Sequence, residues 1–233
     1  MPVYRLIQYW FVKQRLIVRR SQRQKPEKGT LEQYIAPGWS LLLVLCLLFT
    51  ACAGSSPPTR YYLLNPDAEG RNDVSSASGD RALVSLEPVQ IPSYLDRPQM
   101  ITRTAPNRLH LQSFHHWAEP IQETITRVLV QNLAGRLQTI KVVAFPDRFH
   151  QSPDFRILVE ILRFEPIQSH GRVILKAQWS VREANGGHIL CDRTSLFTHT
   201  LPDDSPEAIA AAMSQALSDL STALARCVQA VRQ

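Results

Sequence analysis

The chain has 233 residues and a formal net charge of +6, from 26 Lys or Arg and 20 Asp or Glu. The charge is unevenly placed: eight basic and two acidic residues precede Trp39, whereas the part after residue 51 holds 18 of each. That part is neutral and has no basic cluster with interleaved aromatic residues. The composition therefore excludes a nucleic-acid partner of the usual basic kind and leaves enough chain for one domain of ordinary size.

Residues 1–51 have the pattern of a basic n-region followed by an export signal. Thirteen uncharged residues, 39–51, follow the basic segment. This stretch is shorter than the roughly 20 residues of a membrane-spanning helix and matches the about 7–15 apolar residues of a signal peptide. The basic region is long, so either it is extended or translation starts downstream of Met1. Residues 1–51 are excluded from the fold prediction.

The end of this stretch resembles a bacterial lipobox. In Phe49-Thr50-Ala51-Cys52 a bulky apolar residue and two small residues precede a cysteine, although Leu is usual where Phe49 stands. The small residues let the peptidase reach the backbone, and the Cys52 thiol is the nucleophile that takes diacylglycerol. We expect acyl chains such as palmitate on Cys52, which anchor it firmly at about 0.8 kcal/mol per buried methylene. The alternatives are an ordinary signal peptide or a core helix with a chance cysteine.

Two further cysteines remain in the exported chain, Cys191 and Cys227, because Cys46 leaves with the signal. An exported chain enters an oxidising compartment, where disulfides persist. Cys191 lies in a predicted strand and Cys227 in the last predicted helix. The sequence allows either a disulfide between them or two buried thiols.

Four strands and a helix are predicted after a lipidated tether at residues 52–59. The strands are expected at residues 60–64, 82–92, 99–104 and 108–113, with a polar loop at 65–81. Pro88 should force its strand to a sheet edge or a bulge, and Pro106 lies in the turn of a hairpin.

The first predicted helix covers residues 117–137, with Pro120 in its first turn and Gly135 near its end. Its apolar residues recur at helical spacing and predict one buried face. That face consists of Ile121, Ile125, Val128, Leu129 and Leu133.

The second half repeats this order of elements. Strands are expected at residues 140–145, 154–164, 172–183 and 188–200, the last two joined by a tight turn at 184–187. Ser205 can cap the final helix and Pro206 suits its first position. The apolar stripe of that helix consists of Ile209, Met213, Ala216, Leu217, Leu220, Leu224 and Val228.

The order β-β-β-β-α-β-β-β-β-α predicts an α+β fold. One antiparallel or mixed sheet with two helices on one face would bury both apolar stripes. We expect residues 60–233 to form this single domain.

The exported chain lacks the motifs of common enzyme classes: it has no Gly-x-Ser-x-Gly, no phosphate-binding glycine loop, no HExxH and no CxxC. His115 and His116 are adjacent, so they rarely bind one metal together, and we interpret them as a polar lead-in to the helix. We expect no enzyme, no metal site and no cofactor apart from the covalent lipid on Cys52.

Two acidic pairs have equally simple interpretations. Asp203 and Asp204 precede a helix and are expected to be solvated. Glu119 and Glu123 suit the first turn of a helix, where the helix dipole favours negative charge.

Several segments together resemble a known family. They are RYYLL at residues 60–64, VSLEPVQIPSYLDRPQMITR at 84–103, and WAEP at 117–120, followed by ILVEILRFEP, GRVILKAQWSV and the alanine-rich last helix. The chain resembles the PqiC-type ABC-transport auxiliary lipoproteins of Gram-negative bacteria over nearly all of its exported part. IPSYLDRPQM and WAEP together are fairly specific, whereas either one alone is weak.

The resemblance implies the lipoprotein component of an intermembrane lipid-transport system, without catalytic activity. Its partners would be a periplasmic MCE-domain protein and an inner-membrane component, and a homo-oligomer would be compatible with the resemblance. It implies an anchor in the outer membrane that faces the periplasm. Ala53 agrees, since Asp at that position favours retention in the inner membrane of enterobacteria.

The IPSYLDRPQM segment is the candidate interface with the MCE partner or with a neighbouring copy of the chain. Pro92 and Pro98 stiffen it, and Tyr94, Asp96 and Arg97 are of types that can bind a partner, Tyr and Arg being favoured at interface hot spots. The alternative is a structural turn that Asp96 and Arg97 hold together. Trp117 is expected in the core.

Two other functions are compatible with this sequence. A periplasmic lipid-binding carrier would need a large apolar cavity, whereas the predicted sheet and helices can fill their own core. An assembly lipoprotein for an outer-membrane barrel would share the architecture and lack an MCE partner.

Overall fold

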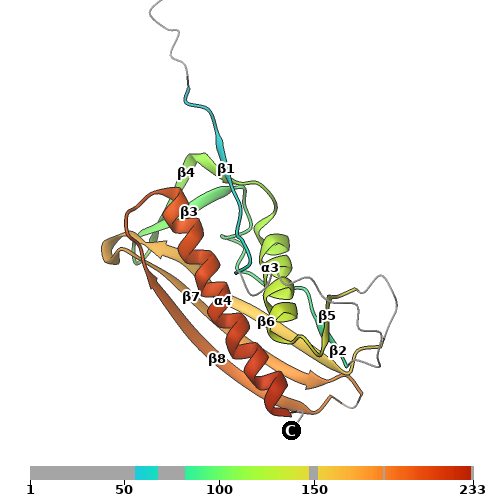
Figure 1. Ribbon diagram of the computed structural model, residues 1–233. Coiled ribbons are helices and arrows are strands. Elements are labelled where there is room, and N and C mark those ends of the chain that lie inside the picture. The colour runs from blue at the N-terminus through green and yellow to red at the C-terminus, as the bar shows by residue number, and fades with distance from the viewer. Residues whose placement is uncertain (1–55, 68–81, 147–151, 186, 232–233) are drawn as a thin grey trace, which may run out of the picture. The chain divides into compact units, whose positions relative to one another are not determined.

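Two groups of four strands, each followed by a long helix, make up the described chain (Figure 1). The computed structural model describes residues 56–67, 82–146, 152–185 and 187–231. They belong, apart from Ser56, to one unit that spans Pro57–Gln233. The signal segment, Cys52, most of the tether and most of the predicted polar loop lie outside the described residues.

The element order agrees with the predicted one. The strands are β1 (Arg60–Tyr62), β2 (Leu83–Leu86), β3 (Gln99–Ala105), β4 (Arg108–Trp117), β5 (Lys141–Ala144), β6 (Phe155–Ile167), β7 (Arg172–Glu183) and β8 (Ile189–Thr200). The helices are α3 (Ile121–Arg136) and α4 (Pro206–Val231), and a short 3-10 turn, η2 (Gln168–His170), joins β6 to β7. Ser205 caps α4 as predicted, because its hydroxyl accepts the Ala208 amide at 3.2 Å.

All eight strands form one mixed sheet organised around β6. On one side β6 pairs antiparallel with β7, which pairs antiparallel with β8. On its other side β6 pairs in parallel with β2 near its start and with β3 near its end. The order along this part of the sheet is β1-β4-β3-β6-β2-β5. The predicted α+β fold with one sheet is confirmed, and the sheet is mixed.

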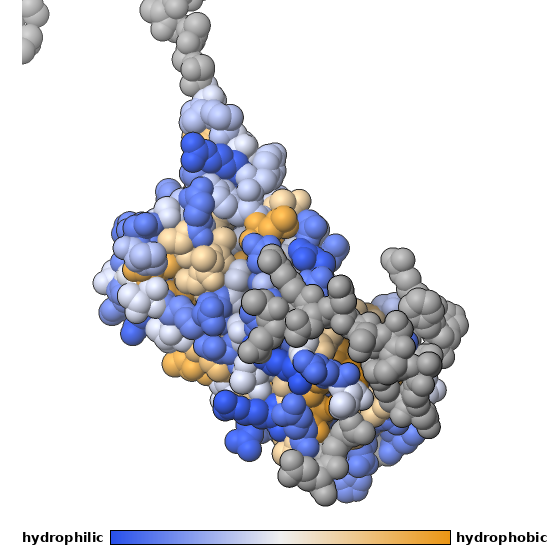
Figure 2. Space-filling model, viewed as in Figure 1, coloured by the Kyte–Doolittle hydropathy of each residue, from blue (hydrophilic) through white to orange (hydrophobic). Residues whose placement is uncertain are grey.

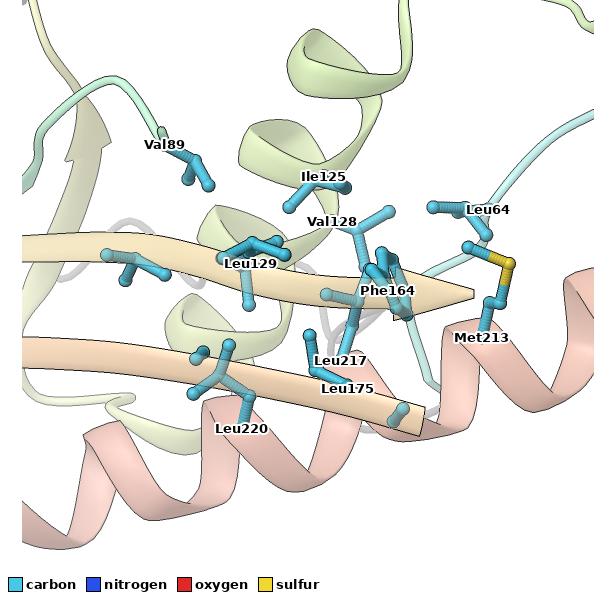
Figure 3. Packing of buried hydrophobic residues seen from close by; sticks show 14 of the residues in the cluster. Leu64, Val89, Ile125, Val128, Leu129, Phe164, Leu175, Met213, Leu217 and Leu220 are labelled. Atoms are coloured by element: carbon cyan, nitrogen blue, oxygen red, sulfur yellow. The ribbon is translucent and has the colours of Figure 1, made fainter. Parts of the chain in front are cut away.

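Both helices cover the same face of the sheet (Figure 1). The two predicted apolar stripes are buried, and Figure 3 shows Ile125 and Leu129 of α3 and Leu217 and Leu220 of α4 directed toward Phe164 and Leu175 of the sheet. The face seen in Figure 2 carries mainly hydrophilic side chains with scattered hydrophobic areas.

A β-bulge in β6 changes which residues face the helices. Before it, Ile157, Val159 and Ile161 alternate as buried residues. The pairing with β7 shifts between Ile161 and Arg163. Because a bulge adds one residue to its strand, Phe164 takes the helix-facing position after it, and Glu165 lies on the opposite face.

The position and the end of β2 differ from the sequence prediction. β2 lies between β5 and β6, not at an edge, and it ends at Leu86 before Pro88, after which Gln90 forms an isolated bridge with Glu160. The chain thus accommodates Pro88 by interrupting the strand.

The first helix starts later than predicted. Trp117 is the last residue of β4, and α3 begins at Ile121 with Pro120 as its N-cap. Proline disfavours the helical conformation of the residue before it, so the helix cannot extend back through Glu119. Trp117 is only 7% exposed and belongs to the core, as predicted.

A disulfide joins β8 to α4. It links Cys191 to Cys227, whose Cα atoms are 6.5 Å apart. Of the two alternatives for these cysteines, the structure has the disulfide. None of the described helices is apolar over a stretch long enough to cross a membrane.

Candidate docking loop and its buried carboxylate

The three segments that carried the family resemblance meet in space. The Trp117 amide donates to the Pro98 carbonyl at 2.7 Å, and the Ala118 amide donates to the Tyr62 carbonyl at 2.9 Å. β1 runs parallel to β4, with Tyr62 opposite Trp117. RYYLL, IPSYLDRPQM and WAEP, far apart in sequence, therefore form one continuous backbone network at this end of the sheet (Figure 1).

Residues 91–98, hereafter the 91–98 loop, form a compact turn between the Gln90 bridge and β3. The Leu95 amide donates to the Pro92 carbonyl at 2.9 Å, and the Arg97 amide donates to the Leu95 carbonyl at 2.8 Å. The Leu95 side chain is 4% exposed and packs in the core. The flanking prolines and these bonds leave the loop little conformational freedom.

A buried carboxylate fastens this loop to the sheet. Glu165 has no exposed surface, and the Tyr94 hydroxyl donates to its Oε2 at 2.7 Å. Arg103 Nε donates to Glu165 Oε1 at 2.7 Å. Arg163 donates to the same oxygen from Nε and Nη2, at 3.1 and 3.0 Å. The Phe164 amide completes the set with a 3.2 Å bond to Oε2.

Burial and these hydrogen bonds change the pKa values of Glu165 and Tyr94. Burial raises the pKa of Glu165, but hydrogen bonds from Tyr94, Arg103 and Arg163 outweigh burial, and the net pKa is lowered. The pKa of Tyr94 is raised, first by burial and then by its bond to Glu165. Glu165 is therefore an ionised acceptor at neutral pH, and Tyr94 is a neutral donor.

The three predicted interface residues have different environments. Tyr94 is half-buried and its hydroxyl bonds to Glu165. Arg97 is also half-buried, and its Nε donates to the Tyr94 carbonyl at 2.8 Å. Asp96 is exposed at the tip of the turn. Tyr94 and Arg97 thus hold the loop, and Asp96 is presented to solvent.

Sequence reasoning missed Glu165 and Arg103. Glu165 lies within ILVEILRFEP and Arg103 at the end of the 84–103 segment, and neither residue is predicted as part of a site. A carboxylate inside an apolar strand, two residues after Arg163, is the signal that could have found this cluster, since buried charges are paired.

A second polar cluster was also missed. Asp67, after β1, pairs with Arg136 of α3, and the Ser218 hydroxyl of α4 donates to Asp67 Oδ2 at 2.7 Å. Arg136 also donates to Thr222 at 3.0 Å. This cluster joins the segment after β1 to both helices.

The other candidate residues have local structural contacts. His115 and His116 lie in β4, not in a lead-in to α3, and their side chains bond to the Tyr62 hydroxyl and the Ser113 carbonyl respectively. Asp203 accepts the Ser205 amide at 2.8 Å before α4. Within the ranges that the structure describes, no group of three or more His, Cys, Asp or Glu side chains is arranged to hold a metal ion.

One family model matches most of the chain, including the loop and both clusters. It describes the ABC-type transport auxiliary lipoprotein component and matches residues 62–225. The chain belongs to this family. The match confirms the resemblance drawn from the three motifs and makes the chain an auxiliary lipoprotein of ABC-type transport.

Solved structures show the same fold at low identity. The crystal structure of an uncharacterized protein has a TM-score of 0.61 and 18% identity, and the match covers 74% of this chain and 99% of that one. A Xanthomonas campestris protein has a TM-score of 0.55 and 17% identity, with coverage of 71% and 92%. These likenesses extend to the fold alone. A search of curated proteins finds no match.

Proposed function

We propose that this auxiliary lipoprotein is the outer-membrane subunit of an intermembrane lipid-transport system and docks a periplasmic MCE-domain protein there. It has no catalytic role. The observation that carries the proposal is the family match over residues 62–225. The lipobox ending at Cys52 supports the anchor, and Ala53 supports export to the outer membrane. An inner-membrane component would complete the system.

The 91–98 loop is the proposed contact with the MCE partner. A loop held by Glu165 and two prolines loses little conformational entropy on binding, which favours affinity. Asp96 lies at its exposed tip and offers a carboxylate to a basic group of the partner. Tyr94 and Arg97 act by holding the tip in place.

The test is co-purification of the lipidated protein from native membranes in mild detergent, with partners identified by mass spectrometry. An MCE-domain protein at near-stoichiometric yield supports the proposal. A barrel protein in its place would favour an assembly role, and bound lipid without a protein partner would favour a carrier. Among the described residues, the sheet and both helices contribute to one cluster of buried hydrophobic side chains, part of which Figure 3 shows, and this argues against the carrier.

A second measurement tests the loop itself. Alanine at both Tyr94 and Arg97 should weaken binding of the MCE protein because the tip loses its support. Unchanged partner binding by a variant with an unchanged circular dichroism spectrum would exclude the 91–98 loop as the interface.

A further inference from the structure

Exposed apolar side chains gather where the tether enters the domain. Among the described residues, seven large hydrophobic side chains are exposed, and four of them lie on β1, directly after it, or on β4. These four are Tyr61 at 65% exposure, Leu63 at 42%, Leu111 at 39% and Phe114 at 38%. The β1–β4 corner consists of Arg60, Tyr61, Leu63 and His116.

The register of the strands brings these residues together. Tyr61 lies opposite His116 and Arg60 opposite His115 in the parallel pair. The rings of Tyr61 and His116 meet edge to face, with centroids 6.1 Å apart. Phe114, two residues earlier on β4, does not belong to this surface. The pairing of β4 with β3 shifts between Leu111 and His116, and Phe114 lines a hollow beside His115 and Ile209 of α4. Tyr61 and Leu63 point away from the core, because the alternate residue, Leu64, is fully buried.

The tether limits how far this corner can lie from the anchor. Seven residues separate Cys52 from Arg60, and even a fully extended chain spans at most about 29 Å over that distance. β1 is the first strand after the tether and lies, with β4, at the end of the domain opposite the C-terminus of α4 (Figure 1). The corner is thus the part of the domain that is tied closest to the proposed lipid.

The chemistry of the corner suits a phospholipid surface. Tyrosine is enriched at the membrane–water interface, where its ring is buried and its hydroxyl is hydrated. Leu63 adds apolar area, and Arg60, an exposed residue, carries a positive charge that can approach lipid phosphates. Apolar residues beside a basic one are typical of segments that lie in the interface.

We infer that the β1–β4 corner rests on the phospholipid leaflet that holds the lipid anchor, and so fixes the orientation of the domain on the membrane. This inference rests on the proposed lipidation of Cys52. It gives the tether a second role, since a short tether and a membrane-seated corner together direct the rest of the domain away from the bilayer.

The test uses tryptophan reporters in the mature lipidated protein, reconstituted into phosphatidylethanolamine–phosphatidylglycerol vesicles with brominated acyl chains. The reporter is Tyr61→Trp, and the matched control is Leu196→Trp on β8, where the native side chain is 63% exposed against 65% for Tyr61. The native Trp117 and Trp179 are buried and common to both variants.

Bromine should quench the Tyr61→Trp emission by about half, as expected for a side chain 5–10 Å deep in the interface, and leave the Leu196→Trp emission nearly unchanged. Adding Leu63→Ser should reduce the quenching of the Tyr61 reporter. Equal quenching of both reporters in protein that floats with the vesicles would overturn the membrane contact of the corner but not the lipid anchor. If mass spectrometry finds no lipid on the protein and the protein does not float with vesicles, both the lipid anchor and the membrane contact of the corner are overturned.

Discussion

Two polar clusters each fasten an irregular segment to the core, but their carboxylates differ in exposure to water. In the first, Glu165 is completely buried and Arg103 is 19% exposed. In the second, Asp67 is 21% exposed and Arg136 is 11% exposed. Ion pairs in a low-dielectric interior interact more strongly and leave a larger penalty when one partner is lost. The comparison predicts that the Glu165 cluster is the more sensitive to substitution.

Replacing the buried carboxylate should have the largest effect. Glu165→Ala leaves Arg103, Arg163 and Tyr94 without their acceptor, and breaking a buried pair destabilises by about 3–5 kcal/mol. The free energy of unfolding in urea measures this loss. A loss no larger than that of Asp67→Ala would contradict the comparison.

The loss of stability on removal of the disulfide can be compared with the losses expected for the two polar clusters. Cys191 and Cys227 are 36 residues apart, and removing a disulfide that closes such a loop destabilises by about 2–4 kcal/mol. The Cys191→Ser, Cys227→Ser double variant should show this loss in urea unfolding. Reductant should lower the stability of the native protein by a similar amount and leave the double variant unchanged.

Acid should remove the stabilising contribution of the Glu165 cluster. The pKa of Glu165 is lowered below the ordinary value of 4.5 in the folded protein. Its stabilising contribution is therefore complete above that value and is lost as the pH falls through the folded pKa. The stability difference between the native protein and Glu165→Gln should shrink below pH 4.5 in urea unfolding. A difference that stays constant from pH 7 to pH 3 would exclude this linkage.

Replacing Asp67, the partly exposed carboxylate of the second cluster, should destabilise the protein less than replacing Glu165. Asp67→Ala removes the acceptor for Arg136 and Ser218, but the carboxylate that is lost is itself partly exposed. The expected loss is about 1–2 kcal/mol, and added salt should reduce the difference between variant and native protein. If salt has no effect on that difference, the pair is less accessible than its exposure indicates.

The sequence predicted the elements well because their signals are local. The alternation of apolar and polar residues predicted β6 and β7, and the helical spacing of Ile209, Met213 and Leu217 predicted α4. The clusters could not be predicted in this way, since Glu165 meets Tyr94 over 71 residues. Its place on the face away from the helices also depends on the bulge after Ile161. The position of β2 inside the sheet likewise depends on pairing with distant strands.

The candidate interface could be predicted only in part, because some of its features are local and others depend on tertiary contacts. The prolines around the 91–98 loop indicate a stiff segment from sequence alone. The division of roles within it, with Tyr94 and Arg97 directed inward and Asp96 outward, follows from tertiary contacts that no local pattern contains.

The most direct test of the central claim is the affinity of the lipidated protein for its purified MCE partner, measured for Asp96→Lys and for the control Asp192→Lys. Both aspartates are exposed, and Asp192 lies on β8. Reversing a charge at an interface should lower the affinity at least about tenfold for Asp96→Lys and leave Asp192→Lys close to the native protein. Equal affinities for both variants, at equal thermal stability, would contradict docking through the 91–98 loop.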